Sequence, residues 1–576
     1  MRKLTWWAVA VTAISIAATS SAAPATTSLL DAAESGDRAT VLRLLAEKGT
    51  NPNMVGADGT TAVMWAAHND DLALVQALIK AGANVKLKNQ FGTSAITEAA
   101  IIGSAPIIEA LLKAGADPNT KNPEGETALM AVARSGKVDA ARRLLDAGAD
   151  VNAKEAWGGQ SAIMWASAQS QAEMVKLLAS RGADVNARGV VRQWERKVIT
   201  EPRPKDMNKG GFTPLLYAAR EGCVECAKHL IEAKADPDLQ DPDGLTPLNM
   251  ALLNQHFNFA SYMIKAGADL DKWDLFGRSP VYMAADVNTL PVMGNGAVVT
   301  IPSEDALRAI DVARQLLAAG ANPNIQLKRR PPYRNVPQDR GGDTILAQNA
   351  TPLLRAARAG DAPFVELLLK NGALVDLPSK EGVTPLMAAA GVEFGARVTR
   401  GRNRTDEAVL ATMKLLLAAG ANVNARSITD ARGGFGGRGG GPAGAGGATP
   451  DGAAARAQAA VGATRRGSQM PSASAIPNQT ALHGAAERGL DAFVKFLVEN
   501  GADLTAKDAN GRTPLDAAKG VTGNGRGSAD AFPKTVALLE SLMAAKGIPV
   551  PAAKLFAELL FLEGALDERA FFYSRR

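Results

Sequence analysis

The most informative pattern along the chain is an alternation of polar turns and short apolar helices that returns every 33 residues. The residue expected to precede the first helix of a unit steps from Thr61 to Ser94 to Thr127, and Thr351 to Thr384 repeats the same interval. Each unit begins with a polar turn, continues through Thr-Pro-Leu or an equivalent into a helix of small residues, and closes with a Leu-rich helix ending in Gly-Ala-Asp or Gly-Ala-Asn. A period of this length, recovered many times, predicts a stack of repeated units.

Each position of the pattern has a physical reason. The Thr hydroxyl caps the first helix, and the Pro of Thr246-Pro247-Leu248 fits the first helical position, where no N–H is needed. Alanine pairs such as Ala66-Ala67 let neighbouring first helices approach closely, and leucine pairs on the second helix bury against adjacent units. The glycine of Gly-Ala-Asp supplies the left-handed residue that ends the second helix. Because no unit can bury both faces alone, stability is predicted to be a sum over neighbour contacts.

Together these residues resemble the ankyrin repeat, and the resemblance covers nearly the whole chain after residue 28. It implies an all-α ankyrin-repeat solenoid of paired antiparallel helices with finger loops, with about 12 repeats from residue 28 to about residue 548. The family's usual His after Thr-Pro-Leu is present only as His483. We therefore expect the hydrogen bonding that this His provides between turns to be weaker in the other repeats.

The first residues read as a targeting segment. Arg2 and Lys3 precede an apolar stretch from Leu4 to Ala18, and small residues follow up to Ala22. This order is typical of a signal peptide, here residues 1–22. An uncleaved membrane anchor is the alternative, but the apolar run is shorter than the roughly 20 residues that a span needs. We expect a periplasmic or secreted protein with no membrane span after signal removal.

Inserts divide the predicted repeats. The expected order is repeats 1–5 at residues 28–188, an insert at 189–207, repeats 6–10 with inserts at 208–427, a Gly/Ala-rich flexible linker at 428–477, repeats 11–12 at 478–548, and a capping segment at 549–576. Further inserts are expected between the two helices of one unit, near 288–302, 392–404 and 521–532. Interruptions of this kind map to loops and need not break the stack.

Composition and charge narrow the function. At 576 residues the chain is too long for one compact core, and aromatics make up only 5%. The formal net charge of +6 is mild, and the basic residues gather in inserts, so nucleic acid is not expected as a partner. An Arg-Gly-Gly tract at 432–440 resembles RNA-binding tracts, but its composition also suits a flexible linker, which is the interpretation we favour.

No catalytic constellation is visible. The four His residues show no zinc-ligand spacing, the Gly-rich tracts lack the Lys-Ser/Thr ending of a phosphate loop, and no Ser occupies a Gly-x-Ser-x-Gly elbow. We expect neither enzyme activity nor a cofactor.

One cluster of chemically active side chains is Cys223, Cys226 and His229. The repeat register places Cys226 and His229 on a second helix where other units carry apolar residues, so a structural role is expected. A disulfide between Cys223 and Cys226 is the first alternative and a metal site the second. Ala227 stands where a c-type haem site requires His, which excludes haem attachment.

The family resemblance implies binding through the finger turns and the exposed side of the first helix, a concave surface. Aromatic residues at the turns are the first candidates for partner contact: Phe91, Trp157, Phe212 and Phe276. The corresponding first-helix candidates are Ile101, Arg134, Arg220, Glu221, Asn254 and Arg358. Each aromatic could instead pack on the neighbouring turn, and Trp65 and Trp165 are expected to pack inward.

The sequence thus predicts an exported, monomeric scaffold that binds a protein partner, whose identity it does not reveal. Two alternatives remain open. One is a secreted effector that acts on another cell by binding, and the other is a redox or metal-dependent protein that uses Cys223 and Cys226.

Overall fold

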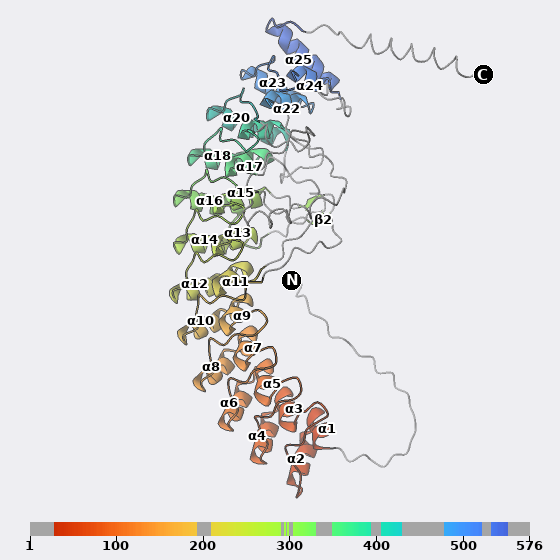
Figure 1. Cartoon of the computed structure of the whole chain (residues 1–576), viewed down its shortest axis with the longest axis vertical. Helices are drawn as coiled ribbons and strands as arrows, with labels where there is room; N and C mark the ends of the chain where they lie inside the picture. The colour runs from red at the N-terminus through yellow and green to blue at the C-terminus, as the bar shows by residue number, and fades with distance from the viewer. Residues whose placement is uncertain are drawn as a thin grey trace, which may run out of the picture. The chain divides into compact units, whose positions relative to one another are not determined.

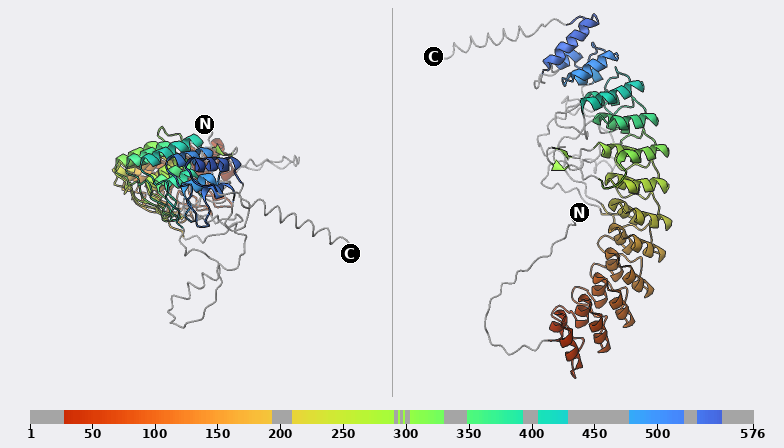
Figure 2. Two further views of the ribbon diagram at one scale, coloured as in Figure 1. Left: turned by 90° about the horizontal axis from the view of Figure 1, so that it is seen from above. Right: turned by 180° about the vertical axis from the view of Figure 1, so that it is seen from behind.

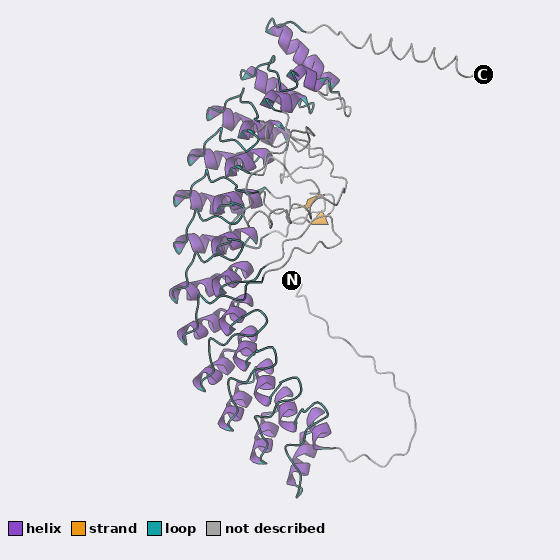
Figure 3. Ribbon diagram, in the orientation of Figure 1, coloured by secondary structure: helices purple, strands orange, loops and turns teal. Residues whose placement is uncertain are grey.

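The computed structural model describes residues 28–192, 209–289, 293–294, 297–298, 303–329, 348–392, 405–428, 477–520 and 531–550 of the chain. Within these residues the protein consists of twelve successive helix pairs and one two-stranded ribbon (Figures 1 and 3). The expected signal peptide and the capping segment after residue 550 lie outside the described residues. The chain forms two compact units, Met1–Trp157 and Gly158–Arg576, which are described one at a time.

The first unit holds four helix pairs. They are α1 (Leu29–Glu34), α2 (Arg38–Ala46), α3 (Ala62–His68), α4 (Leu72–Lys80), α5 (Ala95–Ile102), α6 (Ala105–Lys113), α7 (Ala128–Ser135) and α8 (Val138–Asp146). The first helices α1, α3, α5 and α7 pack in one layer, and the second helices α2, α4, α6 and α8 pack in another (Figure 1). Within this unit, each pair therefore buries its faces against the neighbouring pairs.

The second unit repeats this two-layer arrangement (Figure 2). Its elements are α9 (Ala162–Ala168), α10 (Ala172–Ser180), α11 (Pro214–Glu221), α12 (Val224–Glu232), α13 (Pro247–Leu253), α14 (Phe257–Lys265), α15 (Pro280–Asn288), β1 (Met293–Gly294), β2 (Ala297–Val298), α16 (Ala309–Ala318), α17 (Pro352–Ala359), α18 (Ala362–Lys370), α19 (Pro385–Ala390), α20 (Asp406–Ala418), α22 (Ala481–Ala486), α23 (Asp491–Glu499), α24 (Pro514–Ala518) and α25 (Pro533–Ala545). The antiparallel β1–β2 ribbon follows α15 and precedes α16 in the sequence, so it belongs to the connection between the two helices of one pair. The predicted all-α solenoid is confirmed, with this ribbon as an addition that the sequence pattern did not indicate.

The helix ends follow from the local sequence. The hydroxyls of Thr213, Thr246 and Thr351 accept a hydrogen bond from the backbone N–H three residues on, and Pro occupies the next position. At the other end of the pair, the glycine after the second helix adopts a left-handed conformation, with φ of 84° at Gly267 and 90° at Gly501. The Thr-Pro and Gly-Ala-Asp signatures thus define helix ends where they occur, whereas Thr61 and Ser161 precede their helices without a side-chain cap hydrogen bond, which corrects the expectation that this hydroxyl caps every first helix.

Lys234 occupies this left-handed glycine position in the pair α11–α12, with φ of 71°. An L-residue with a side chain pays roughly 1 kcal/mol there. We expect Lys234→Gly to raise the free energy of unfolding of this region by about that amount, which a thermal or urea melt would measure.

The matched control is Gly267→Lys in the next pair. No atom lies within 4 Å of a Cβ placed on Gly267, so the substitution tests backbone strain without a steric clash. The two variants should shift stability by similar amounts in opposite directions. If both variants were as stable as the unmodified protein, the left-handed conformation would carry no free-energy cost for a residue with a side chain here.

The core consists of small residues between first helices and of branched aliphatic residues along second helices. The pairs Ala66-Ala67, Ala218-Ala219 and Ala485-Ala486 are fully buried. Leu111 and Leu316 are fully buried on their second helices. Close-packed interiors of this kind tolerate little change in side-chain volume, which keeps the repeat spacing uniform.

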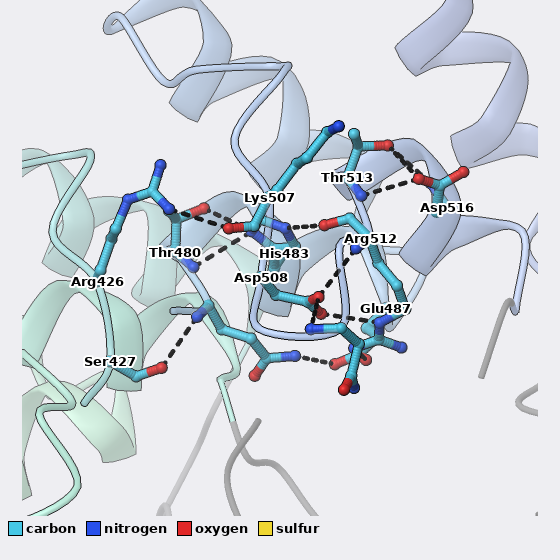
Figure 4. Close-up of polar contacts among 12 residues, drawn as sticks. Arg426, Ser427, Thr480, His483, Glu487, Lys507, Asp508, Arg512, Thr513 and Asp516 are labelled. Carbon is cyan, nitrogen blue, oxygen red and sulfur yellow. Dashed lines mark hydrogen bonds and ion pairs between the residues drawn. The ribbon is translucent and has the colours of Figure 1, made fainter. Parts of the chain in front are cut away.

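His483 connects the two last described pairs, as Figure 4 shows. Its Nδ1 accepts a hydrogen bond from the Thr480 backbone N–H at 3.2 Å, and its Nε2 donates to the Arg512 carbonyl at 3.0 Å. Burial lowers the pKa of His483, so the ring is neutral at pH 7 and keeps one nitrogen free to accept. The inter-turn role expected of this His from the family pattern is present at this position.

Candidate partner-binding surface

Several finger turns share one geometry, set by the polar residue that opens the turn. The Oδ1 of Asp274 accepts hydrogen bonds from the backbone N–H groups of Phe276 at 3.0 Å and Arg278 at 2.9 Å. Asn89 holds Phe91 and Thr93 in the same way, at 3.0 and 2.9 Å. The residue two positions after the opening residue therefore stands at the tip of the turn.

Backbone hydrogen bonds also join one finger to the next. The N–H after the opening residue donates to the tip carbonyl of the preceding finger, as in Gln90 to Asp58 at 2.8 Å and Leu275 to Asp243 at 2.9 Å. Where that position is Pro123, no N–H is available and the ladder is interrupted. Where it is continuous, the ladder holds neighbouring tips in place before any partner arrives, which reduces the ordering cost of binding.

Two of the four aromatic candidates are open to solvent at finger tips. Phe91 is 60% exposed and Trp157 is 72% exposed. Phe276 is half-buried, and the Arg278 guanidinium lies over its ring at 5.3 Å. Large exposed apolar side chains on a pre-formed turn are suited to anchor a partner.

The expectation for Phe212 is wrong. Phe212 is only 3% exposed and packs edge-on against Tyr217, with ring centroids 5.3 Å apart. Phe212 directly precedes the helix cap Thr213. It is therefore equivalent to Arg278, which precedes the cap of the helix after its turn, and not to a tip residue. The insert at 189–207 hid this register. The Val190 N–H donates to the Gly158 carbonyl at 2.7 Å, as the N–H after an opening residue does in other fingers. Among the described residues of this finger, Val190 and Val191 are exposed.

Five of the six first-helix candidates reach solvent. Ile101 is 57% exposed, and four polar residues are exposed or half-exposed: Arg134, Arg220, Glu221 and Asn254. Arg134 pairs with Glu126 at 2.8 Å, and Arg220 pairs with Glu221 at 2.7 Å. These side chains add charged and polar groups to the exposed surface.

The expectation for Arg358 is wrong as well. Arg358 is 2% exposed, and its Nη1 donates to the Val392 carbonyl at 2.8 Å. The chain after α19 continues through Gly391 and Val392 and covers this position, which an uninterrupted repeat would leave open. Arg358 therefore acts in packing between pairs.

Sequence reasoning missed an apolar group on the finger that holds Asp274. Trp273 is 49% exposed, Leu275 is also exposed, and the Lys328 ammonium lies 5.6 Å from the Trp273 ring centroid. Trp273 and Leu275 flank the opening residue Asp274, so they could have been found by examining the positions beside each opening residue and not the tip alone. Trp65 and Trp165 were expected to pack inward, and the structure shows both half-buried.

Asp241 opens a turn without a cationic partner. Its Oδ1 accepts from the Asp243 and Leu245 N–H groups at 2.9 and 2.8 Å. The equivalent Asp274 pairs with Arg278, four residues on, at 2.6 Å, whereas Asp241 has Leu245 at that position. Burial, with the nearby charge of Asp243, raises the pKa of Asp241 to about 6.

Asp241→Asn is therefore expected to stabilise the protein at neutral pH. The folded pKa of about 6 lies above the ordinary aspartate pKa of 3.8, so the folded state holds its proton more tightly than the unfolded state and loses stability as pH rises through this window. Asn does not titrate and can accept the same bonds, as Asn89 does. Melts should show a gain of about 1 to 3 kcal/mol at pH 7 that disappears near pH 4.

The control is Asp274→Asn, which removes one partner of the buried Arg278 ion pair and should destabilise at pH 7. A gain from Asp241→Asn that stayed constant between pH 4 and pH 8 would contradict the assignment to Asp241 ionisation.

Cys223 and Cys226 form a disulfide with Cα atoms 5.3 Å apart. Cys226 is fully buried, as expected of a structural residue. The two cysteines are bonded to each other, however, so the disulfide that the sequence offered as the first alternative is the one that the structure contains. His229 lies 3.4 Å from Glu232 through its Nδ1. Across the residues that the structure describes, no group of three or more His, Cys, Asp or Glu side chains is arranged to hold a metal ion.

Among these same described residues, no helix has the length and apolar character of a membrane span.

Family models confirm the resemblance. A model of three ankyrin repeats matches residues 29–122, 96–189 and 215–293. A model of many ankyrin repeats matches residues 455–518, and the single ankyrin repeat matches residues 348–380 and 381–428. These matches span well over half of the chain, and the chain belongs to the ankyrin-repeat family.

Comparison with individual proteins adds less. The crystal structure of the human ASB11 ankyrin repeat domain is 22% identical over 42% of this chain and 98% of that chain, with a TM-score of 0.35. No curated protein matches the chain. Ankyrin repeats imply a scaffold for protein–protein interaction, and this is the class of protein that the fold defines.

Proposed function

We propose that this chain is an exported scaffold that binds a protein partner through its finger tips and the exposed side of its first helices. The observation that supports this most strongly is the exposure of Phe91 and Trp157 on turns whose backbones are held by side-chain and inter-finger hydrogen bonds. Single exposed apolar residues are common on protein surfaces, but aromatic residues fixed at the tips of rigid turns are suited to fill pockets of a partner.

The exposed side chains of each unit are of mixed polarity. In the first unit the His68 Nδ1 lies 3.0 Å from the Glu98 carboxylate, and Ile101 and Arg134 are exposed on the following first helices. In the second unit Trp273 and Leu275 supply the exposed apolar area, with Lys328 beside them. Protein interfaces combine aromatic and aliphatic groups with arginine, lysine and acidic side chains in this way. A surface that binds nucleic acid would instead carry a continuous stripe of basic residues.

The experiment that tests binding is affinity capture from the native compartment with the mature chain as bait, beside a Phe91→Ser/Trp157→Ser bait. We expect one protein to be retained by the unmodified bait, to be lost with the double variant, and to bind in defined stoichiometry when both proteins are purified. Equal retention by the two baits would reject the finger tips as the binding site.

Export is tested separately. Arg2, Lys3 and the apolar run to Ala18, followed by small residues, support cleavage after Ala22. We expect the N-terminal sequence of the protein isolated from its source to begin at Ala23 and the protein to be absent from the cytosolic fraction. A cytosolic chain that retains Met1 would contradict export without affecting the binding proposal.

A further inference from the structure

The Cys223–Cys226 disulfide lies across the first turn of α12. Cys223 is the residue that caps this helix and is half-buried, whereas Cys226 is fully buried. One sulfur atom therefore belongs to a residue at the surface and the other to a residue in the core between α12 and its neighbours. An incoming thiol can approach only the Cys223 side.

The bond is not needed to form the turn that it spans. Second helices elsewhere begin with an aspartate whose carboxylate accepts from the N–H three residues on: Asp71 from Leu74 at 2.9 Å, and Asp361 from Phe364 at 3.2 Å. These helices form without a covalent link. A bridge between residues three apart closes a very short loop, where the gain from restricting the unfolded chain is smallest.

The same comparison shows that the cap position stabilises a negative charge. Hydrogen bonds from Thr40 hold the pKa of the capping Asp37 below its usual value. The Cys223 Sγ occupies the equivalent place and accepts from the Cys226 N–H at 3.2 Å. When the disulfide opens, a Cys223 thiolate would keep this hydrogen bond and the favourable field of the helix N-terminus.

The charges around Cys223 do not oppose this. Glu221 pairs with Arg220 at 2.7 Å, and Glu225 pairs with Lys228 at 2.6 Å, so the two carboxylates nearest in sequence each have a cation beside them.

The cap residues of the two neighbouring second helices are not acidic, although the Asp305 carboxylate accepts a hydrogen bond from the Asn258 N–H at 2.8 Å in the first turn of α14. Helix α10 begins with the uncharged Gln171. The cap of α14 is His256, whose Nε2 donates to the Arg220 carbonyl at 2.9 Å and whose ring packs against Gly222, next to Cys223.

We propose that Cys223 and Cys226 form a thiol–disulfide exchange site that oxidises dithiols of peptides or proteins. A thiolate of the dithiol attacks the Cys223 Sγ, the bond between the two cysteines breaks, and its electron pair passes to the Cys226 Sγ, which takes up a proton. The second thiolate of the dithiol then attacks the first sulfur of the same dithiol, which is bonded to the Cys223 Sγ in the mixed disulfide. Cys223 then leaves as a thiolate held by the Cys226 N–H. The dithiol is oxidised to a disulfide, the protein disulfide is reduced, and one proton is released to solvent.

The first test uses the mature full chain and dithiothreitol as the probe dithiol at pH 7, with thiols counted by mass spectrometry after alkylation. We expect the disulfide to open in the folded protein, with the helical circular dichroism unchanged, and Cys223 to react with iodoacetamide about tenfold faster than an ordinary exposed thiol. Cys226 should remain unmodified until the protein unfolds. A disulfide that stays closed in excess dithiothreitol until unfolding would overturn the proposal.

Two variants calibrate the reactivity. Asn510→Cys, in a chain with Cys223→Ser and Cys226→Ser, provides the ordinary exposed thiol. Cys226→Ala leaves Cys223 alone with the N–H of residue 226 intact, so its fast alkylation should persist. A Cys223 thiol that reacts no faster than the thiol at position 510 would also overturn the proposal.

The last readout is transfer to a substrate. Mixed with a fluorescently labelled peptide dithiol, the oxidised protein should convert about one equivalent of peptide to its disulfide, and the Cys223→Ser protein should convert none. Failure of this transfer would reject the exchange site and leave the partner-binding proposal untouched, because the finger tips are not involved.

Discussion

An Arg512→Ala protein is expected to unfold its last two described helix pairs well before the rest of the chain. The Arg512 Nε lies 2.8 Å from the Asp508 Oδ2, a carboxylate with no exposed surface, and its Nη2 lies 2.9 Å from the Glu487 Oε1 (Figure 4). Removing the cation leaves Asp508 charged and buried, which costs about 3 to 5 kcal/mol. Because repeat stability is local, the loss should appear as a separate early transition in a thermal melt.

The chain supplies its own control for this result. Asn89 and Thr93 occupy the positions of Asp508 and Arg512 in another finger and close the same turn without charges. The double variant Asp508→Asn/Arg512→Thr should therefore recover most of the stability that Arg512→Ala loses. If the single and double variants unfolded at the same temperature, the buried ion pair would not be the cause.

Replacing Phe91 or Trp157 by alanine is expected to weaken partner binding about 30-fold for each residue. Central aromatic anchors contribute about 2 kcal/mol or more when truncated, and 2 kcal/mol corresponds to about a 30-fold change in Kd. Both side chains are mostly solvent-exposed in the free protein, so the melting temperature should change little. Isothermal titration calorimetry with the purified partner, together with a melt of each variant, measures both effects.

Phe212→Ala is the comparison for this pair. It truncates an aromatic residue that was a tip candidate by sequence but is buried against Tyr217, so it should cost about 3 to 5 kcal/mol of stability. Any loss of binding should follow its loss of folded protein. A Phe212→Ala protein that stays fully stable yet binds more weakly would return Phe212 to the binding surface.

The fold could be predicted from the sequence because many helix ends have a local cause. Thr246 before Pro247 and the left-handed Gly267 define their helix ends through backbone chemistry alone. The β1–β2 ribbon could not be predicted in this way, since it lies inside an insert that does not follow the repeat period.

The binding surface was predicted less well because exposure depends on register and on neighbouring chain. Phe212 was assigned to a tip because the insert before it broke the 33-residue count. Arg358 was assigned to the surface because nothing in its own repeat indicates that Val392 covers it. Phe91 lies at the surface where the uninterrupted register places it, and Trp157 is exposed as well although its finger carries one residue more than the 33-residue period.

The most direct test of partner binding at the finger tips is site-specific photo-crosslinking in the native compartment. A photoreactive phenylalanine analogue is placed at Phe91 or Trp157 and, as the control, at Arg142, an exposed residue of the second helix α8. We expect one crosslinked protein from positions 91 and 157 and none from position 142. Crosslinking to the same protein from position 142 alone would show that the partner binds the second-helix face and would contradict the finger-tip surface.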